Sequence, residues 1–401
     1  MNAEQRSVFQ GIVYYYREHT VLCRYELTMK DPVDAELLQQ ACDEARPLAG
    51  YFFQKVVWEK REAHLAPNDA PFRVRIGHVQ PHIPEDTDDY QLACSCEGNQ
   101  IFFDWFHFLA DGRGGSQLMT LVLKLYCNLR YGTAFACEPL VSDPPYDIED
   151  ILARYPESQV ENDMQKEVTQ TSEAKPQLVR VRLDKQSLLD AALPLGVKPF
   201  SALITLFCKA GREYLGRDDL MYNYSTDARD AMGTPKALFN CVASFQRPVT
   251  VTEADTLATL VPGVEADIRH NLTKEPKLFR VAEQMAWGTR GNARALPPRT
   301  KKAASRRAGT FWVSYQGDPF VPADPDLEKY LTDFQTWVPA DGASIGVECT
   351  TLHGVITICI QNKAQKPGYA AALRRAFESA GVKVLEAAEL GPSPYTSPYI
   401  P

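Results

Sequence analysis

The segment that most constrains the fold joins a strand to a helix through a run of glycines. IFFDWFHFLA, at 101–110, is dense in aromatic residues and has the composition of a strand with at least one buried face. DGRGGS follows at 111–116, and QLMTLVLKLYCNLRYG then repeats its apolar residues at helical spacing up to Gly132. We therefore expect a buried strand that carries His107 near its end, a sharp turn after it, and a long helix with Ser116 as a plausible N-cap.

Strand-like and helix-like segments alternate along the rest of the chain. VLCRYELTM predicts a strand, and DAELLQQACDEA predicts a helix capped by Asp34. Later, LVRVRL, LMYNYSTDAR, ASFQRPVTV and GTFWVSYQG predict strands, PFSALITLFCKAGREYLG and GYAAALRRAFESAG predict helices, and SIGVECTTLHGVITICIQ predicts a hairpin that turns near His353. The pattern predicts an α+β fold, a mixed α/β chain without the βαβα rhythm of a doubly wound sheet.

The length and one weakly patterned region predict the domain organisation. A chain of 401 residues is too long for one ordinary core and suits two domains. Pro, Asp, Glu, Gln and Ser are frequent from Pro139 to about Gln177, which is typical of a linker with at most one short helix. We therefore expect an N-terminal subdomain at 1–138, a linker at 139–177 and a C-terminal subdomain at 178–401.

Charge and composition argue against several classes of partner. The formal net charge of −8 argues against nucleic acid, because phosphate binding needs a concentrated basic face, and against anionic membranes. No apolar stretch approaches the length of a membrane-spanning helix, and the start of the chain lacks the basic and apolar regions of a signal peptide. The ten cysteines are scattered within apolar patterns, where they act as small buried hydrophobes. We expect a reduced, cytoplasmic protein.

Several catalytic motifs are absent or badly placed. The chain has no phosphate-binding G-x-x-x-x-G-K-[ST] or G-x-G-x-x-G motif. Cys94 and Cys96 form a C-x-C without a second Cys or His pair at zinc-finger spacing, and His78 and His82 lie in a Pro-bearing, strand-like stretch that does not favour a shared metal face, so we expect no metal.

One G-x-S-x-G motif surrounds Ser344, but it leads into a strand-like segment, and His353 follows without an intervening aspartate. A serine hydrolase needs that motif between a strand and a helix. Hydrolysis through Ser344 is therefore the weakest of the alternatives, and a chance turn explains the motif better.

His107 has two interpretations when its residues are taken alone. A buried neutral histidine costs little when both ring nitrogens are satisfied, so a lone histidine is usually structural. Its place at a strand end, before glycines that allow a close approach of other groups, also suits a base that titrates near neutral pH.

The wider context resembles a known family. The HxxxDG motif, after a hydrophobic strand and before a glycine-opened helix, resembles the signature of the chloramphenicol-acetyltransferase-like superfamily, which includes peptide-synthetase condensation domains and alcohol acetyltransferases. YYYREHTVLCRYELTMKDPVDAELLQQACDEARPLAGYF, STDARDAMGTPKALFNCVASFQRPV and WVSYQGDP are similar to further superfamily segments, in the same order along the chain. The resemblance implies two chloramphenicol-acetyltransferase-like subdomains, each a mixed β-sheet flanked by helices, with the active site in a tunnel between them.

The resemblance also implies roles for individual residues. His107 matches the general base of the motif, and Asp111 matches an aspartate that points away from the catalytic centre and holds the loop. Arg229 matches the arginine that pairs with this aspartate, and a bidentate pair of that kind fixes a turn firmly. Gly112 lies where a side chain would crowd the channel.

Some positions depart from the family pattern. Condensation domains usually carry two adjacent histidines, whereas Phe106 precedes His107 here, which favours the alcohol acetyltransferase branch. The DFGWG segment of the plant enzymes is absent. Phe239 and Asn240 stand where a Gly-Asn turn is usual, and Asn240 and Ser314 are candidates for an oxyanion donor or a tunnel residue.

The implied function is acyl transfer from a thioester, expected to be acyl-coenzyme A, to a small alcohol or amine. The one strongly basic run, at 290–308, offers Arg306 and Arg307 to the coenzyme's phosphates or to an acyl carrier protein, although a solvated loop explains it equally well. Two halves could form the tunnel within one chain, so we expect a monomer. The alternatives are a non-catalytic or carrier-protein-dependent relative of the condensation domains and, last, the serine hydrolase.

Overall fold

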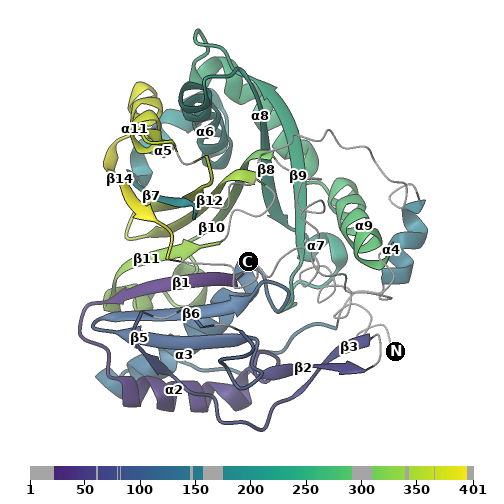
Figure 1. The fold of residues 1–401 in the computed structure, drawn as a ribbon, viewed down its shortest axis with the longest axis vertical. Coiled ribbons are helices and arrows are strands. Elements are labelled where there is room, and N and C mark those ends of the chain that lie inside the picture. Colours follow the sequence, from purple (N-terminus) through teal and green to yellow (C-terminus); the bar gives the residue numbers. More distant parts are fainter. Residues whose placement is uncertain are drawn as a thin grey trace.

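Two large β-sheets, each covered by helices, make up most of the molecule (Figure 1). The structure is a computed structural model, and it describes residues 22–59, 62–78, 80–81, 83–144, 148–156, 175–290, 309–338, 343–364 and 366–394. The predicted mixed α/β class is confirmed.

The first sheet contains the strand that leads to His107. Its five strands, in spatial order, are β11 (Leu331–Trp337), β1 (Leu22–Met29), β6 (Gln100–Phe106), β5 (Leu92–Glu97) and β4 (Arg75–Ile76). A hairpin joins β5 to β6, with Gly98 in the left-handed conformation at the turn. Helices α2 (Ala35–Leu48) and α3 (Gly112–Tyr131) pack together on one face and close a core of apolar side chains.

Helix α3 begins earlier than the sequence suggests. Its N-cap is Asp111, whose side chain accepts a hydrogen bond from the Gly114 backbone N–H at 2.9 Å. Ser116 lies inside the first turns, and its hydroxyl donates to the Arg113 carbonyl instead. The prediction of Ser116 as N-cap is therefore wrong, because an aspartate with this local bond is an equally good cap that stands before the glycines.

Close packing explains why glycines occupy the start of α3. A Cβ atom on Gly114 would lie 2.1 Å from the Leu238 carbonyl oxygen, and one on Gly112 would lie 2.6 Å from Cδ of Gln316. Both neighbours belong to the second half of the chain. The glycine run therefore lets the two halves approach each other beside His107.

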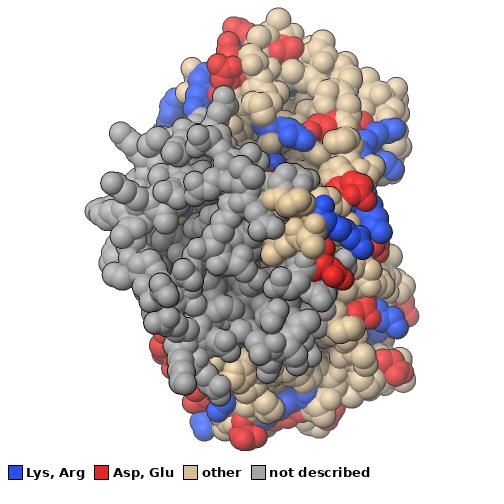
Figure 2. All heavy atoms as spheres, turned by 90° about the vertical axis from the view of Figure 1, so that its right-hand side faces the viewer, with Lys and Arg blue, Asp and Glu red and all other residues tan. Residues whose placement is uncertain are grey.

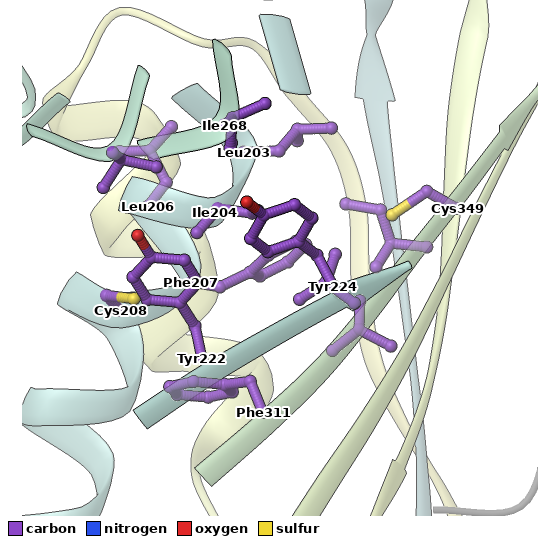
Figure 3. Packing of buried hydrophobic residues seen from close by; sticks show 14 of the residues in the cluster. Leu203, Ile204, Leu206, Phe207, Cys208, Tyr222, Tyr224, Ile268, Phe311 and Cys349 are labelled. Atoms are coloured by element: carbon purple, nitrogen blue, oxygen red, sulfur yellow. The ribbon is translucent and has the colours of Figure 1, made fainter. Parts of the chain in front are cut away.

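The second sheet has seven strands and its own core. In spatial order they are β14 (Val384–Pro392), β7 (Gln177–Asp184), β13 (Val355–Asn362), β12 (Ala343–Leu352), β10 (Gly309–Gly317), β8 (Asp219–Asp227) and β9 (Val242–Thr250). Helices α5 (Lys185–Ala192), α6 (Pro199–Leu215), α8 (Leu257–Asn271) and α11 (Tyr369–Ser379) cover one face. Phe207 from α6 packs among Tyr224 and Phe311 of the sheet in this core (Figure 3).

Smaller elements complete the described chain. They are the hairpin of β2 (Gln54–Glu59) and β3 (Glu62–Pro67), helices α4 (Ile148–Arg154), α7 (Arg229–Met232), α9 (Lys274–Arg290) and α10 (Phe320–Ala323), and the 3₁₀ turns η2 (Leu193–Leu195) and η4 (Pro325–Tyr330). Among the described residues no single helix has the length and hydropathy to cross a bilayer; α5 with η2, taken together with α6, has the length and composition but bends by 98°.

One strand crosses between the halves. β11 follows β10 along the chain, yet it leaves the second sheet and pairs antiparallel with β1 at the edge of the first, with Trp337 opposite Arg24. The first sheet therefore takes a strand from the predicted C-terminal subdomain. The boundaries at 138 and 178 stay a proposal for how the chain is divided.

Candidate active site

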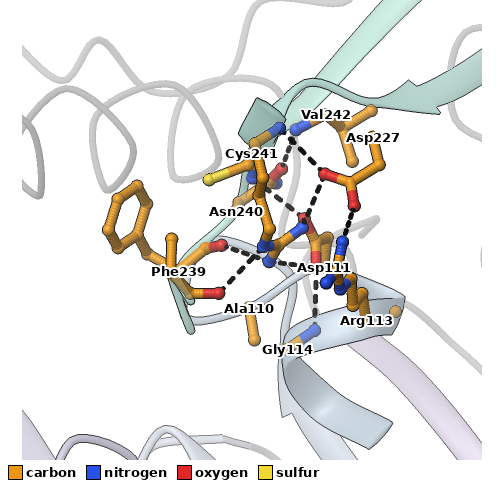
Figure 4. Close-up of polar contacts among 12 residues, drawn as sticks. Ala110, Asp111, Arg113, Gly114, Asp227, Phe239, Asn240, Cys241 and Val242 are labelled. Atoms are coloured by element: carbon orange, nitrogen blue, oxygen red, sulfur yellow. Dashed lines mark hydrogen bonds and ion pairs between the residues drawn. The ribbon is translucent and has the colours of Figure 1, made fainter. Parts of the chain in front are cut away.

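Asp111 and Arg229 form a buried ion pair where the two halves meet (Figure 4). Nη1 of Arg229 lies 2.8 Å from Oδ2 of Asp111, and Nη2 lies 2.9 Å from Oδ1, which is a bidentate arrangement. Arg229 is 0% exposed and Asp111 is 3% exposed. The structure thus brings together two residues that are 118 positions apart in the sequence.

Every N–H group of Arg229 has an acceptor. Besides the two bonds to Asp111, Nε donates to the Ala237 carbonyl at 2.8 Å, Nη2 to the Phe239 carbonyl at 2.9 Å, and Nη1 to Oδ1 of Asp227 at 3.1 Å. Burial alone would lower the pKa of Arg229, but the Asp111 carboxylate raises it well above its usual value. Arg229 therefore stays charged, and five donors in a fixed fork hold the segment around it.

Asp111 is as fully satisfied as its partner. Each of its oxygens accepts two hydrogen bonds, one from Arg229 and one from a backbone N–H: Gly114 bonds to Oδ1 and Cys241 to Oδ2, each at 2.9 Å. The carboxylate caps α3, where negative charge favours the helix dipole, and fixes the start of β9. All these bonds are internal, so the geometry fits an architectural role.

His107 lies in the turn that directly follows β6 and is partly buried. Its ring Nδ1 is 2.9 Å from Nδ2 of Asn240, and the same Nδ2 donates to the His107 carbonyl at 3.2 Å. The Val242 N–H donates to Oδ1 of Asn240 at 3.1 Å, which turns the amide nitrogen toward the histidine. Two predicted site residues, His107 and Asn240, are therefore in contact.

The surroundings of His107 favour the neutral imidazole. Burial lowers its pKa below the usual 6.5, and the Asp111 carboxylate opposes this only in part. The ring also hydrogen-bonds to its own backbone carbonyl. When Nδ1 carries the proton for that bond, the Asn240 amide donates to the His107 carbonyl and not to Nδ1, and Nε2 keeps the lone pair that a general base needs.

A second polar group, which the sequence did not reveal, lies beside Gly112. The Tyr25 hydroxyl is 2.6 Å from the Gly112 carbonyl oxygen and 2.5 Å from Oε1 of Gln316. Nε2 of Gln316 lies 3.5 Å from Oε2 of Glu348, and the Ser314 hydroxyl donates to the same carboxyl group. Burial raises the pKa of Glu348 to about 7, although these two hydrogen bonds act to lower it. Ser314, a predicted oxyanion or tunnel candidate, is thus bonded to a carboxyl group.

Weak signals for this group were present in the sequence. Ser314 and Gln316 are two positions apart in one predicted strand, so their side chains are expected on the same face. Glu348 is the only charged residue of β12. The role of Tyr25 could not be predicted from the sequence, because an aromatic residue in a strand is usually part of the hydrophobic core.

The remaining predicted residues lie elsewhere. Arg306 and Arg307 fall outside the described residues, and Figure 2 shows basic and acidic side chains interspersed over the described part of one face. Ser344 lies within β12, so its G-x-S-x-G motif is not at the strand-to-helix turn that a serine hydrolase uses. His353, in the left-handed conformation at the β12–β13 turn, hydrogen-bonds to the Leu331 carbonyl.

Comparison with known proteins identifies the fold. Models of protein families and curated protein sequences both give no match. Among solved structures, the chain is similar to the TRI3 trichothecene 15-O-acetyltransferase from Fusarium sporotrichioides, with a TM-score of 0.64 and 11% identity over 94% of this chain and 93% of that one. It is also similar to F. sporotrichioides TRI101 complexed with coenzyme A and T-2, with a TM-score of 0.62 and 12% identity over 94% and 98%.

Condensation domains give equally extensive matches. The first condensation domain of the CDA synthetase matches with a TM-score of 0.61 and 12% identity, over 94% of this chain and 99% of that one. At these identities the likeness concerns the fold, and it extends over 94% of this chain. The predicted resemblance is confirmed at the level of the fold, which this chain shares with these acetyltransferases and condensation domains.

Proposed function

We propose that the protein is an acyltransferase that moves an acyl group from a thioester to an alcohol or amine, with His107 as the general base. The observation that carries this proposal is the placement of His107: it follows β6 directly, its backbone carbonyl accepts a hydrogen bond from Asn240, and it lies next to the buried pair of Asp111 and Arg229. Burial of the ring favours its neutral form.

The proposed reaction needs one base and no covalent enzyme intermediate. Nε2 of His107 takes the proton from the acceptor's hydroxyl or amine group as that group attacks the thioester carbonyl carbon. The carbon–sulfur bond then breaks, and the imidazolium returns the proton to the departing thiolate, which gives a thiol and an ester or amide. General-base help of this kind accelerates a reaction by roughly a hundredfold to ten-thousandfold. Holding both substrates in one site supplies a further part of the rate enhancement.

The donor is proposed to be acyl-coenzyme A. One structure of the same fold, TRI101, is complexed with coenzyme A and T-2, which shows that the fold can hold such a pair in that protein. The basic run at 290–308 is the proposed contact for the coenzyme's phosphates through Arg306 and Arg307. Charge reversal at both positions would then raise the KM for the donor.

A panel assay tests the proposal. The protein is incubated with acyl-coenzyme A and a set of alcohols and amines, and release of the thiol is followed. Thiol release that depends on an acceptor is the expected result. Release without any acceptor would indicate hydrolysis, and no release with any acceptor would contradict acyl transfer from coenzyme A.

Condensation with a carrier-bound donor is the second candidate. The observation that favours it is the extensive match to the condensation domain of the CDA synthetase. Presenting the same acyl group on coenzyme A and on a carrier protein's pantetheine arm separates the two candidates. The proposed function predicts faster transfer from coenzyme A, and a strict requirement for the carrier would support condensation instead.

A further inference from the structure

The group formed by Tyr25, Gln316 and Glu348 links the second sheet to the loop that carries His107. Glu348 lies on β12 and is 6% exposed, and the parallel pairing of β10 with β12 sets it opposite Ser314. Gln316, two residues further along β10, reaches over Gly112. Tyr25, on β1 of the first sheet, is 0% exposed and completes the path to the Gly112 carbonyl.

These hydrogen bonds cannot all form at the same time, because there are too few hydrogens. The Tyr25 hydroxyl has a single hydrogen but lies within 2.6 Å of two oxygens, one on Gln316 and one on Gly112. If the Gln316 carbonyl faces Tyr25, the hydroxyl donates to it and the Gly112 oxygen receives nothing from Tyr25. If the Gln316 amide turns over, its N–H donates to the Tyr25 oxygen, and the hydroxyl is then available to Gly112.

The two arrangements correspond to two protonation states of Glu348. An ionised Glu348 only accepts hydrogen bonds, so it favours the orientation in which Nε2 of Gln316 donates to its carboxylate and to Oγ1 of Thr336, each at 3.5 Å. A protonated Glu348 can donate to the Gln316 carbonyl, which turns the N–H group toward Tyr25. A proton on Glu348 thus reverses the whole chain of bonds up to Gly112.

We propose that Glu348 is a positioning residue: its protonation, relayed through Gln316 and Tyr25, attaches the Gly112 carbonyl to the second sheet and so fixes the loop between His107 and α3. This inference rests on the proposed function for its effect on catalysis, but the relay itself does not. Burial raises the pKa of Glu348 to about 7, so both states are populated near neutral pH.

The described groups around Glu348 leave it to titrate without a charged partner. β10 and β13 contain no charged residue, and Asp333, the single charge of β11, is paired with Arg182. On β1, Arg24 is paired with Asp104 and lies 4.0 Å from the buried Glu26. Both charged residues adjoin Tyr25 in the sequence, so their side chains lie on the opposite face of the strand from Tyr25. At the start of α3, Asp111 is paired with Arg229. The other titratable neighbours are neutral groups whose pKa burial raises: Cys23 and Tyr25 on β1, Cys349 on β12 and Cys359 on β13.

A titration of the Glu348 side-chain carboxyl carbon by ¹³C NMR tests the relay without any substrate, with the signal assigned by its loss in Glu348→Gln. In Tyr25→Phe the protonated state loses two hydrogen bonds and the ionised state loses one, so the pKa of Glu348 falls. Tyr315→Phe is the matched control: Tyr315 neighbours Gln316 on β10, but its hydroxyl lies 3.2 Å from Thr351, so the pKa of Glu348 stays unchanged. An equal pKa in Tyr25→Phe and wild type would overturn the inference.

The pH profile of acyl transfer tests the catalytic consequence. Glu348→Gln is neutral and can donate to Gln316, so above pH 7 it is more active than wild type by roughly twofold to tenfold, the worth of one hydrogen bond. The inflection near 7 disappears in this variant and in Gln316→Leu, which breaks the relay if Tyr25→Phe does not fold. An inflection that persists in Glu348→Gln would overturn the positioning role. If no substrate is turned over, the proposed function fails, and the NMR titration still decides the relay.

Discussion

At the scale of single residues, neighbouring positions of one motif differ in their environment. Both carboxylate oxygens of Asp111 already accept hydrogen bonds from Arg229 and from two backbone N–H groups, so Asp111 is not available to bind a substrate. His107, four residues earlier, lies beside Asn240, and burial lowers its pKa and so favours the neutral ring. Under the proposed function the motif combines a reactive group with a structural one, and the two should respond differently to substitution and to pH.

The pH dependence of acyl transfer should reflect the lowered pKa of His107. Because burial keeps this pKa below 6.5, the base stays neutral down to a lower pH than an ordinary histidine would. Activity should therefore fall on the acid side with an apparent pKa below 6.5 in a profile of kcat/KM. An acid limb at or above 6.5 would contradict this environment. The same shift makes the folded state lose stability relative to the unfolded state as the pH falls below 6.5.

At the scale of elements, the junction of β6 with α3 is where sequence and structure agree best. The aromatic strand, the turn and the long helix were all predictable, because apolar spacing and glycine content determine them locally. The N-cap was not, since Asp111 and Ser116 are both acceptable caps and only the bond to Gly114 separates them. The pairing of Asp111 with Arg229 followed from the family resemblance and not from spacing.

Asp111→Ala should unfold the protein more easily than Ser116→Ala. The first substitution removes the bidentate partner of the buried Arg229 and, of its bonds to carboxylates, leaves only the single one to Asp227, and the loss of one partner of a buried ion pair typically costs about 3–5 kcal/mol. Ser116 is not the cap, and its hydroxyl bonds only to a nearby carbonyl, so Ser116→Ala should change the free energy of unfolding by less than about 0.5 kcal/mol. Thermal or denaturant unfolding measures both. Equal stabilities of Asp111→Ala and wild type would contradict the architectural role.

Gly114→Ala should separate the two halves at the start of α3. The new Cβ atom would lie 2.1 Å from the Leu238 carbonyl oxygen, so the backbone of one half has to move. Gly263→Ala, within α8, is the matched control because nothing lies within 4 Å of its Cβ position. We expect Gly114→Ala to lose stability and activity, and Gly263→Ala to be stabilised by roughly 0.5–1 kcal/mol. A Gly114→Ala variant as stable as wild type would show that the close approach is not required.

At the scale of the whole molecule, the site depends on contacts that no local pattern records. β11 pairs with β1 across about three hundred residues of sequence. Its sequence, LTDFQTW, lacks the regular alternation of apolar and polar residues that predicts a strand. The relay from Glu348 to Gly112 joins β12, β10, β1 and α3, so it exists only once both sheets are assembled. The overall two-lobed fold was predictable because the family resemblance covers nearly the whole chain.

The central claim is that His107 acts as the base while the fold around it is held by other residues. The most direct measurement is acceptor-dependent thiol release from acyl-coenzyme A by wild type and by His107→Ala, with the melting temperature of both proteins. The account predicts that the variant loses roughly a hundredfold or more of kcat while keeping a melting temperature close to that of wild type. A His107→Ala protein that still transfers the acyl group at the wild-type rate would contradict the account.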